Sequence, residues 1–93
     1  MTIGLLQLRL RIPSNQSLKG KRQVLLGLKT RIRRKFNVSV AETEDQDKWQ
    51  VATVAVACIG VEQTGVNRCL NQVVELAERD REAELTDVEM QFL

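Results

Sequence analysis

The 93-residue chain contains no histidine and no tyrosine, and it has one tryptophan, one proline and two cysteines. Without histidine it lacks the most frequent general base of enzymes and the most frequent metal ligand. No GxSxG turn, Walker loop or GxGxxG turn occurs in it. Cys58 and Cys69 form no CxxC motif, so we expect buried structural thiols rather than a zinc site or disulfides. The sequence therefore predicts a protein that is not an enzyme and that holds no metal or cofactor.

Long apolar runs are also missing. Residues 1–12 alternate between apolar and polar side chains, and they lack a basic lead and a small-residue cleavage site. We therefore expect neither a signal peptide nor a membrane span, and a cytoplasmic location. The length is enough for one small domain, residues 1–93, with a single two-layer core.

The charges are segregated along the chain. Residues 1–41 hold ten Lys or Arg and no acid, whereas residues 42–93 hold four Lys or Arg and twelve acids, so formal charges of +10 and −8 make up the net +2. Such asymmetry is typical of proteins with a polyanionic partner. The alternative is that the two halves fold against one another and neutralise part of the field.

Two periodicities follow one another in the sequence. Alternation typical of half-buried strands covers residues 3–12, 37–42, 49–59 and 85–92, with Leu85 out of step in a way that indicates a β-bulge. Apolar spacings of three and four, typical of amphipathic helices, cover residues 17–35 and about 65–80. Pro13 ends the first strand, residues 14–16 make a polar connection, and we expect Ser17 to cap the first helix.

The order βαββαβ predicts a ferredoxin-like fold of the α+β class. This fold is a four-stranded antiparallel sheet with the first and third strands central and two helices on one face. The other face of the sheet stays open. By alternation, the open face carries mostly small and polar side chains: Gln7, Arg9, Arg11, Ser39, Ala41, Trp49, Val51, Thr53, Ala55, Ala57, Asp87 and Glu89.

The helix predicted at residues 17–35 holds eight of the fourteen basic residues. Its apolar sector comprises Leu18, Val24, Leu25, Leu28, Ile32 and Phe36. A cationic row lies opposite, at Lys19, Arg22, Lys29 and Arg33, with Leu26 within the row and Arg34 beside it. Such a row can bind phosphates by charge and by bidentate arginine hydrogen bonds, so Lys19, Arg22, Lys29, Arg33 and Arg34 are the predicted nucleic-acid-binding residues. An ordinary solvated helix surface is the alternative interpretation.

Acidic residues gather between the second and third predicted strands, at Glu42, Glu44, Asp45 and Asp47. An EF-hand spacing is absent, and charged residues are common in hairpin connections, so we interpret this segment as a solvated turn. Trp49 follows it, either as an anchor for a partner or as a cover for the sheet edge.

Several of these segments resemble a known family. Arg11-Ile12-Pro13, the stretch SLKGKR at residues 17–22, FNVSVAE at 36–42 and QDKWQ at 46–50 are similar to the YlxP-like family of small bacterial proteins of unassigned function. Gly20 stands where that family's usual pattern has an acid. The resemblance spans the chain and implies a ferredoxin-like fold. It also implies a bacterial gene neighbourhood rich in translation and ribosome-maturation genes.

Two functions remain open at this point. One is binding of structured RNA or the ribosome through the basic helix, by backbone or shape, because the open sheet face has no mid-strand Phe or Tyr on which bases could stack. The other is a protein-interaction module, either a homodimer or a domain that docks on an assembly protein, using the small residues of the open face.

Overall fold

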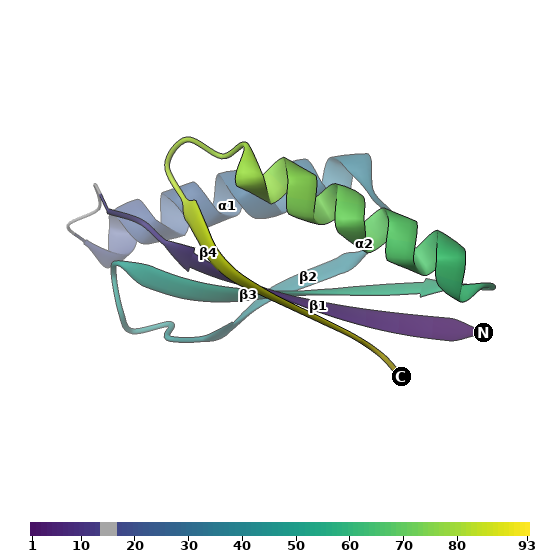
Figure 1. The fold of residues 1–93 in the computed structure, drawn as a ribbon. Coiled ribbons are helices and arrows are strands. Elements are labelled where there is room, and N and C mark those ends of the chain that lie inside the picture. The colour runs from purple at the N-terminus through teal and green to yellow at the C-terminus, as the bar shows by residue number, and fades with distance from the viewer. Residues whose placement is uncertain (14–16) are drawn as a thin grey trace.

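The chain folds as β1 (Thr2–Arg11), α1 (Leu18–Lys35), β2 (Ser39–Glu44), β3 (Val51–Gly60), α2 (Gln63–Glu78) and β4 (Glu84–Phe92) (Figure 1). The computed structural model describes residues 1–13 and 17–93. The predicted polar connection at residues 14–16 lies outside the described residues. In the described part of the chain, neither helix is long and apolar enough to cross a membrane.

The four strands form one antiparallel sheet in the order β2-β3-β1-β4, so the two central strands are β3 and β1. Figure 1 shows both helices on the same face of this sheet, with the opposite face uncovered. The predicted ferredoxin-like α+β fold is therefore confirmed. In this arrangement, the side chains of each strand alternate between the helix-covered face and the open face.

The core lies between the helices and the sheet. The even-numbered residues of β1 from Leu6 to Leu10 are buried, as are Val54 and Val56 of β3. The helices supply the other layer, through Leu25, Leu28 and Ile32 of α1 and Val66, Leu70, Val73 and Ala77 of α2. These residues confirm the apolar stripes expected from the helical spacing.

Gly4 lets α2 approach β1 closely. A Cβ atom at this position would lie 2.6 Å from Val66 Cγ1 and 2.7 Å from Leu70 Cδ1, both shorter than real Cβ contacts. The missing side chain therefore sets the distance between the helix and the central strand.

The strand pairing contains two irregularities. The register of β1 with β4 shifts between Arg9, which pairs with Asp87, and Leu10, which pairs with Leu85. This shift confirms the predicted bulge, because the extra residue returns Leu85 to the core side. A second shift, between Glu42 and Glu44 in the pairing of β2 with β3, was not predicted.

Trp49 does not lie on the open face of the sheet, where the sequence interpretation placed it. The third strand begins at Val51, so Trp49 lies in the preceding connection and not on the open face of the sheet. The Gln50 carbonyl still accepts from the Ile12 N–H at 2.8 Å, in register with the β1–β3 pairing, whereas the Lys48 carbonyl accepts from Lys21 Nζ of α1. The indole is 44% exposed.

Candidate nucleic-acid interface

Helix α1 begins with a side-chain cap and then accumulates positive charge. The Ser17 Oγ accepts a hydrogen bond from the Gly20 N–H at 3.0 Å, as predicted for an N-cap. The first turn of α1 contains no acid, but it carries Lys19 and Lys21, and Arg22 follows directly. Cations near a helix N-terminus oppose the macrodipole, at a cost of about 0.3–1 kcal/mol each where they are exposed. The local sequence therefore gives up helix stability for positive charge, as is typical of a functional surface.

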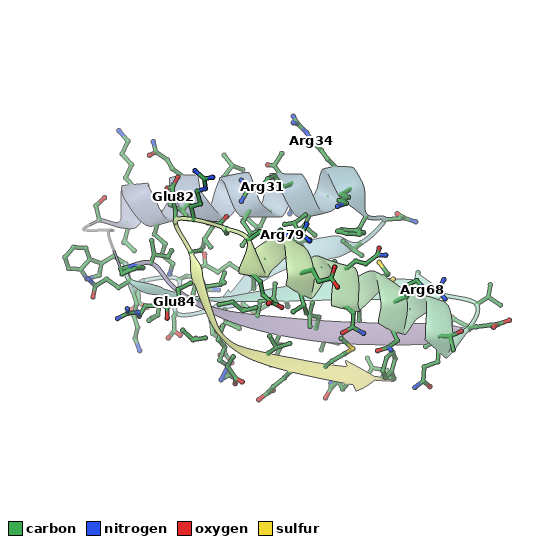
Figure 2. The ribbon with its side chains drawn as sticks, turned by 45° about the horizontal axis from the view of Figure 1, so that its top comes forward. Arg31, Arg34, Arg68, Arg79, Glu82 and Glu84 are labelled. Atoms are coloured by element: carbon green, nitrogen blue, oxygen red, sulfur yellow. The ribbon has the colours of Figure 1, made fainter. Side chains whose placement is uncertain are left out.

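Four of the five predicted nucleic-acid-binding residues have no partner within the part of the chain that the structure describes. Lys19, Arg22 and Arg34 are exposed and Lys29 is half-buried. Among the residues that the structure describes, no ion pair or hydrogen bond involves these four side chains. Figure 2 shows Arg34 pointing away from the body of the molecule. These cations remain available to an external anion.

Arg33, the fifth predicted residue, is partly engaged. Its Nη2 donates to the Val40 carbonyl at 2.8 Å. Val40 lies on β2, an edge strand of the sheet. The hydrogen bond from Arg33 therefore occupies a backbone acceptor that could otherwise pair with a strand of another chain. One of the five N–H donors of Arg33 is therefore used inside the protein. The contact also places Arg33 on the flank of α1 that faces β2, and helical spacing puts Arg22 and Lys29 on the same flank.

Lys21 is a residue whose role the sequence interpretation missed. Its side chain is 1% exposed and its Nζ lies 2.9 Å from Glu42 Oε2, in an ion pair that is not aligned as a hydrogen bond. The same ammonium donates to the backbone carbonyls of Asp45 and Lys48, at 2.5 Å each. Lys21 therefore anchors the β2–β3 connection to α1, and Glu42 is not the solvated turn residue that we expected. A signal was present, because Lys21 stands between Leu18 and Leu25 at apolar-face spacing.

A groove runs between α1 and the end of α2 together with the connection to β4. Its two cavities have volumes of about 430 and 390 Å³ and share Arg31, Asp80, Arg81 and Glu82. The first is also lined by Gly20 and Gly27 of α1, and the second by Lys35, Leu76 and Arg79. Figure 2 shows Arg31 on α1 opposite Arg79 and Glu82. We call this feature the interhelix groove.

Asp80 organises the interhelix groove. Its side chain is 5% exposed and forms an ion pair with Arg31 through Oδ2. Its Oδ1 accepts hydrogen bonds from the Glu82 and Ala83 N–H groups, at 2.8 Å each. With both oxygens satisfied inside the protein, Asp80 holds the Arg31 guanidinium in place across the groove.

The two cysteines are neighbours. Cys58 is buried on β3, and Cys69 is half-buried on α2. Burial, together with the adjacent Cys58 thiol, raises the pKa of Cys69 from 9.0 to about 11. A thiol with so high a pKa is protonated near neutral pH and is a poor nucleophile, as expected for a structural cysteine.

The open face of the sheet is divided into two halves. The pairing aligns Leu5 with Ala57, and Ile3 with Ile59, in an apolar half to which Ala41 and Ala55 add small side chains. Ile59 is 61% exposed. The other half is charged, with Arg9 paired to Glu89 and Arg11 to Glu84. The sequence interpretation listed the small and charged residues but omitted Ile3, Leu5 and Ile59.

The acidic residues of the β2–β3 connection form no metal site in the described part of the chain, where no group of three or more potential ligands comes together. Asp45 pairs with Lys48 at 3.3 Å.

A small ferredoxin-like domain with a basic helix is the class that this fold and surface define. The chain belongs to the DUF503 family: the model of this family, described as a protein of unknown function, matches residues 3–90. The chain is also 36% identical over 70 residues to the uncharacterized protein YlxP of Bacillus subtilis (strain 168), covering 75% of this chain and 76% of that protein. The resemblance noted in the sequence is thereby confirmed.

Solved structures share the fold at low identity. The de novo designed protein Foldit4 matches with a TM-score of 0.54 and 14% identity, over 98% of this chain and 96% of that one. A mutant of SnoaB, a cofactor-independent oxygenase from Streptomyces nogalater, matches with a TM-score of 0.52 and 12% identity, over 99% and 90% of the two chains. At such identities the likeness concerns the fold alone.

Proposed function

We propose that this protein is a non-enzymatic cytoplasmic domain that binds structured RNA, on the ribosome or during its maturation, through the basic surface of α1. The observation that carries this proposal is a set of cations on α1 that have no partner within residues 1–13 and 17–93: Lys19, Arg22, Lys29 and Arg34. None of the four gains an ion pair or hydrogen bond among the described residues, and Lys19 in the first turn of α1 also opposes the helix dipole. A bound polyanion would supply the missing partners and offset that cost.

The geometry favours recognition of the phosphate backbone. The cationic row from Lys19 to Arg33 spans fifteen residues of helix, and the fourteen steps between them make about 21 Å at a rise of about 1.5 Å per residue. The open face of the central strands offers Leu5, Gln7 and Ala55 rather than aromatic rings. Base stacking on the sheet is therefore replaced by contacts to backbone and shape.

Salt-dependent binding of ribosomal RNA tests the proposal. In the variant R22Q/K29Q, the slope of log affinity against log salt concentration should flatten by about two relative to the parent protein, roughly one for each lost phosphate contact. The variant K48Q/R68Q removes the same charge from other elements and should change the slope little. Equal slopes for R22Q/K29Q and the parent protein would show that the row makes no phosphate contacts.

Homodimerisation through the open sheet face is the second candidate function. The apolar half of that face, which includes the exposed Ile59, favours a second copy of the chain as the occupant, because a two-fold axis would bring two such halves together. Lysine at Ala55 or Ala57 would place an unpaired charge in that interface, so A55K and A57K should dissociate the dimer and leave a folded monomer. Sedimentation of the parent protein as a monomer at high concentration would exclude this candidate.

A further inference from the structure

The interhelix groove has the charge and shape of an anion site. Four cations line it, Arg31 and Lys35 from α1 and Arg79 and Arg81 from the end of α2 and the loop after it. Of the two carboxylates on its walls, Asp80 is buried and its oxygens are satisfied within the protein. The four cations therefore outnumber the two carboxylates, and the walls of the groove carry a net positive charge.

The arginine at the centre of the groove is pre-organised. Asp80 pairs with Nη2 of the Arg31 guanidinium. The other N–H donors of this half-exposed group are not bonded to Asp80. An arginine already held by a buried carboxylate loses little side-chain entropy when it binds a phosphate. Such pre-organisation distinguishes Arg31 from Lys19, Arg22 and Lys29, which have no partner among the described residues. We call the cationic row of α1 the outer row: Lys19, Arg22, Lys29 and Arg33.

Gly27 leaves the α1 wall of the groove open. Among the described residues, a Cβ at this position would meet only Arg31 Nη1, at 3.6 Å, which is an ordinary contact. Internal packing therefore does not require glycine here, although glycine is unfavourable in the middle of a helix. The absence of a side chain leaves room at this wall for close approach from outside the protein.

We infer that the interhelix groove binds phosphate groups, through Arg31, Lys35, Arg79 and Arg81. For the source of the phosphate, the inference depends on the proposed function: the RNA backbone would enter the groove while the outer row of α1 contacts the neighbouring strand. The groove would fix the orientation of the RNA, because its cations come from two elements, whereas the outer row lies on one helix.

Charge-matched variants test the inference. R79Q/R81Q removes two cations from the groove, R22Q/K29Q removes two from the outer row, and K48Q/R68Q removes two from elsewhere on the protein. Arg31 is kept in all three variants, so that Asp80 retains its partner. Binding of a fluorescently labelled RNA hairpin is measured by anisotropy at several salt concentrations. We expect R79Q/R81Q to flatten the salt slope by about two, and K48Q/R68Q to leave it nearly unchanged.

Gly27→Leu tests the groove without changing any charge. Leucine is a better helix former than glycine, so the melting temperature should not fall, while the larger side chain should weaken RNA binding at least tenfold by filling the α1 wall. Normal RNA binding by both R79Q/R81Q and G27L would exclude RNA phosphates from the groove. A lower melting temperature of R79Q/R81Q with unchanged RNA binding would show that the two arginines stabilise the C-terminus of α2 instead.

Titration with inorganic pyrophosphate separates the inference from the proposed function. If the parent protein binds no RNA, the proposed function fails, but pyrophosphate binding that disappears in R79Q/R81Q would still support a phosphate site for a small molecule. If RNA bound only to the outer row, pyrophosphate binding that disappears in R79Q/R81Q would likewise support a phosphate site for a small molecule in the groove. If the groove variants bind RNA normally, or if no RNA binds, the absence of pyrophosphate binding to the parent protein overturns the inference.

Discussion

Replacing Lys21 by methionine should destabilise the domain strongly. The substitution keeps most of the buried volume but removes a charge that contacts Glu42 and two backbone carbonyls. Removing one partner of a fully buried ion pair costs about 3–5 kcal/mol, because the other charge is left unpaired. Since the Glu42 side chain is 17% exposed, we expect the lower end, about 3 kcal/mol. For a domain of this size, that loss corresponds to a fall in melting temperature of about 12–24 °C.

Urea and thermal unfolding of three variants would test this reasoning. Lys19→Met makes the same chemical change on the solvent side of α1, and its free energy of unfolding should stay within about 0.5 kcal/mol of the parent value. The double variant K21M/E42Q should recover about 1–2 kcal/mol of the loss, because no carboxylate is then left unpaired. A K21M variant as stable as the K19M variant would refute the view that the Lys21 contacts stabilise the fold.

Four further predictions concern the core and the thiol packed against it. Gly4→Ala should lower the free energy of unfolding by about 1–3 kcal/mol, since its Cβ would lie 2.6 Å from Val66 Cγ1; an unchanged urea midpoint would mean that α2 can shift without cost. Leu28→Ala, at a fully buried site, should cost about 2–5 kcal/mol and leave the salt slope of RNA binding unaltered; a changed slope would place Leu28 in the interface. Alkylation of Cys69 at pH 8 should be slow in the folded protein and fast in urea, and rapid native labelling would contradict the burial described above. Because the folded pKa of about 11 lies above the ordinary 9.0, the stability contributed by this thiol is complete below about pH 9 and is lost between pH 9 and 11, which unfolding at stepped pH would detect.

The strands and helices were predictable because each packs one face against the core, although β4 does so only with partly buried residues. The alternation of Leu6, Leu8 and Leu10 with polar residues requires a strand, and the spacing of Leu25, Leu28 and Ile32 requires a helix. Boundaries were less certain where polar residues flank a strand. The second strand was predicted to begin at residue 37 and begins at Ser39, because nothing in the local pattern marks that start.

The candidate site was only partly predictable. The position of the cationic row on α1 follows from helical spacing alone, and so does the buried position of Lys21. Helical spacing does not reveal the partner of Arg33 or those of Lys21. The interhelix groove could not be predicted in the same way. Arg31 and Asp80 are 49 positions apart, and their pairing depends on how α1 and α2 pack on the sheet. Likewise, no spacing rule indicates that Arg33 covers the backbone of β2.

The central position of β1 has a consequence for the order of folding. Its residues pair with partners 40 to 58 positions later on β3 and 73 to 88 positions later on β4. During synthesis from the N-terminus, one edge of β1, which carries Leu6 and Leu8, therefore stays unpaired until β4, the last of the four strands, has been made. Contacts so distant in sequence slow folding, and an unpaired edge with buried-type side chains favours association with other chains. A chain that stops before Glu84 would expose that edge permanently, and we expect it to aggregate or to depend on chaperones.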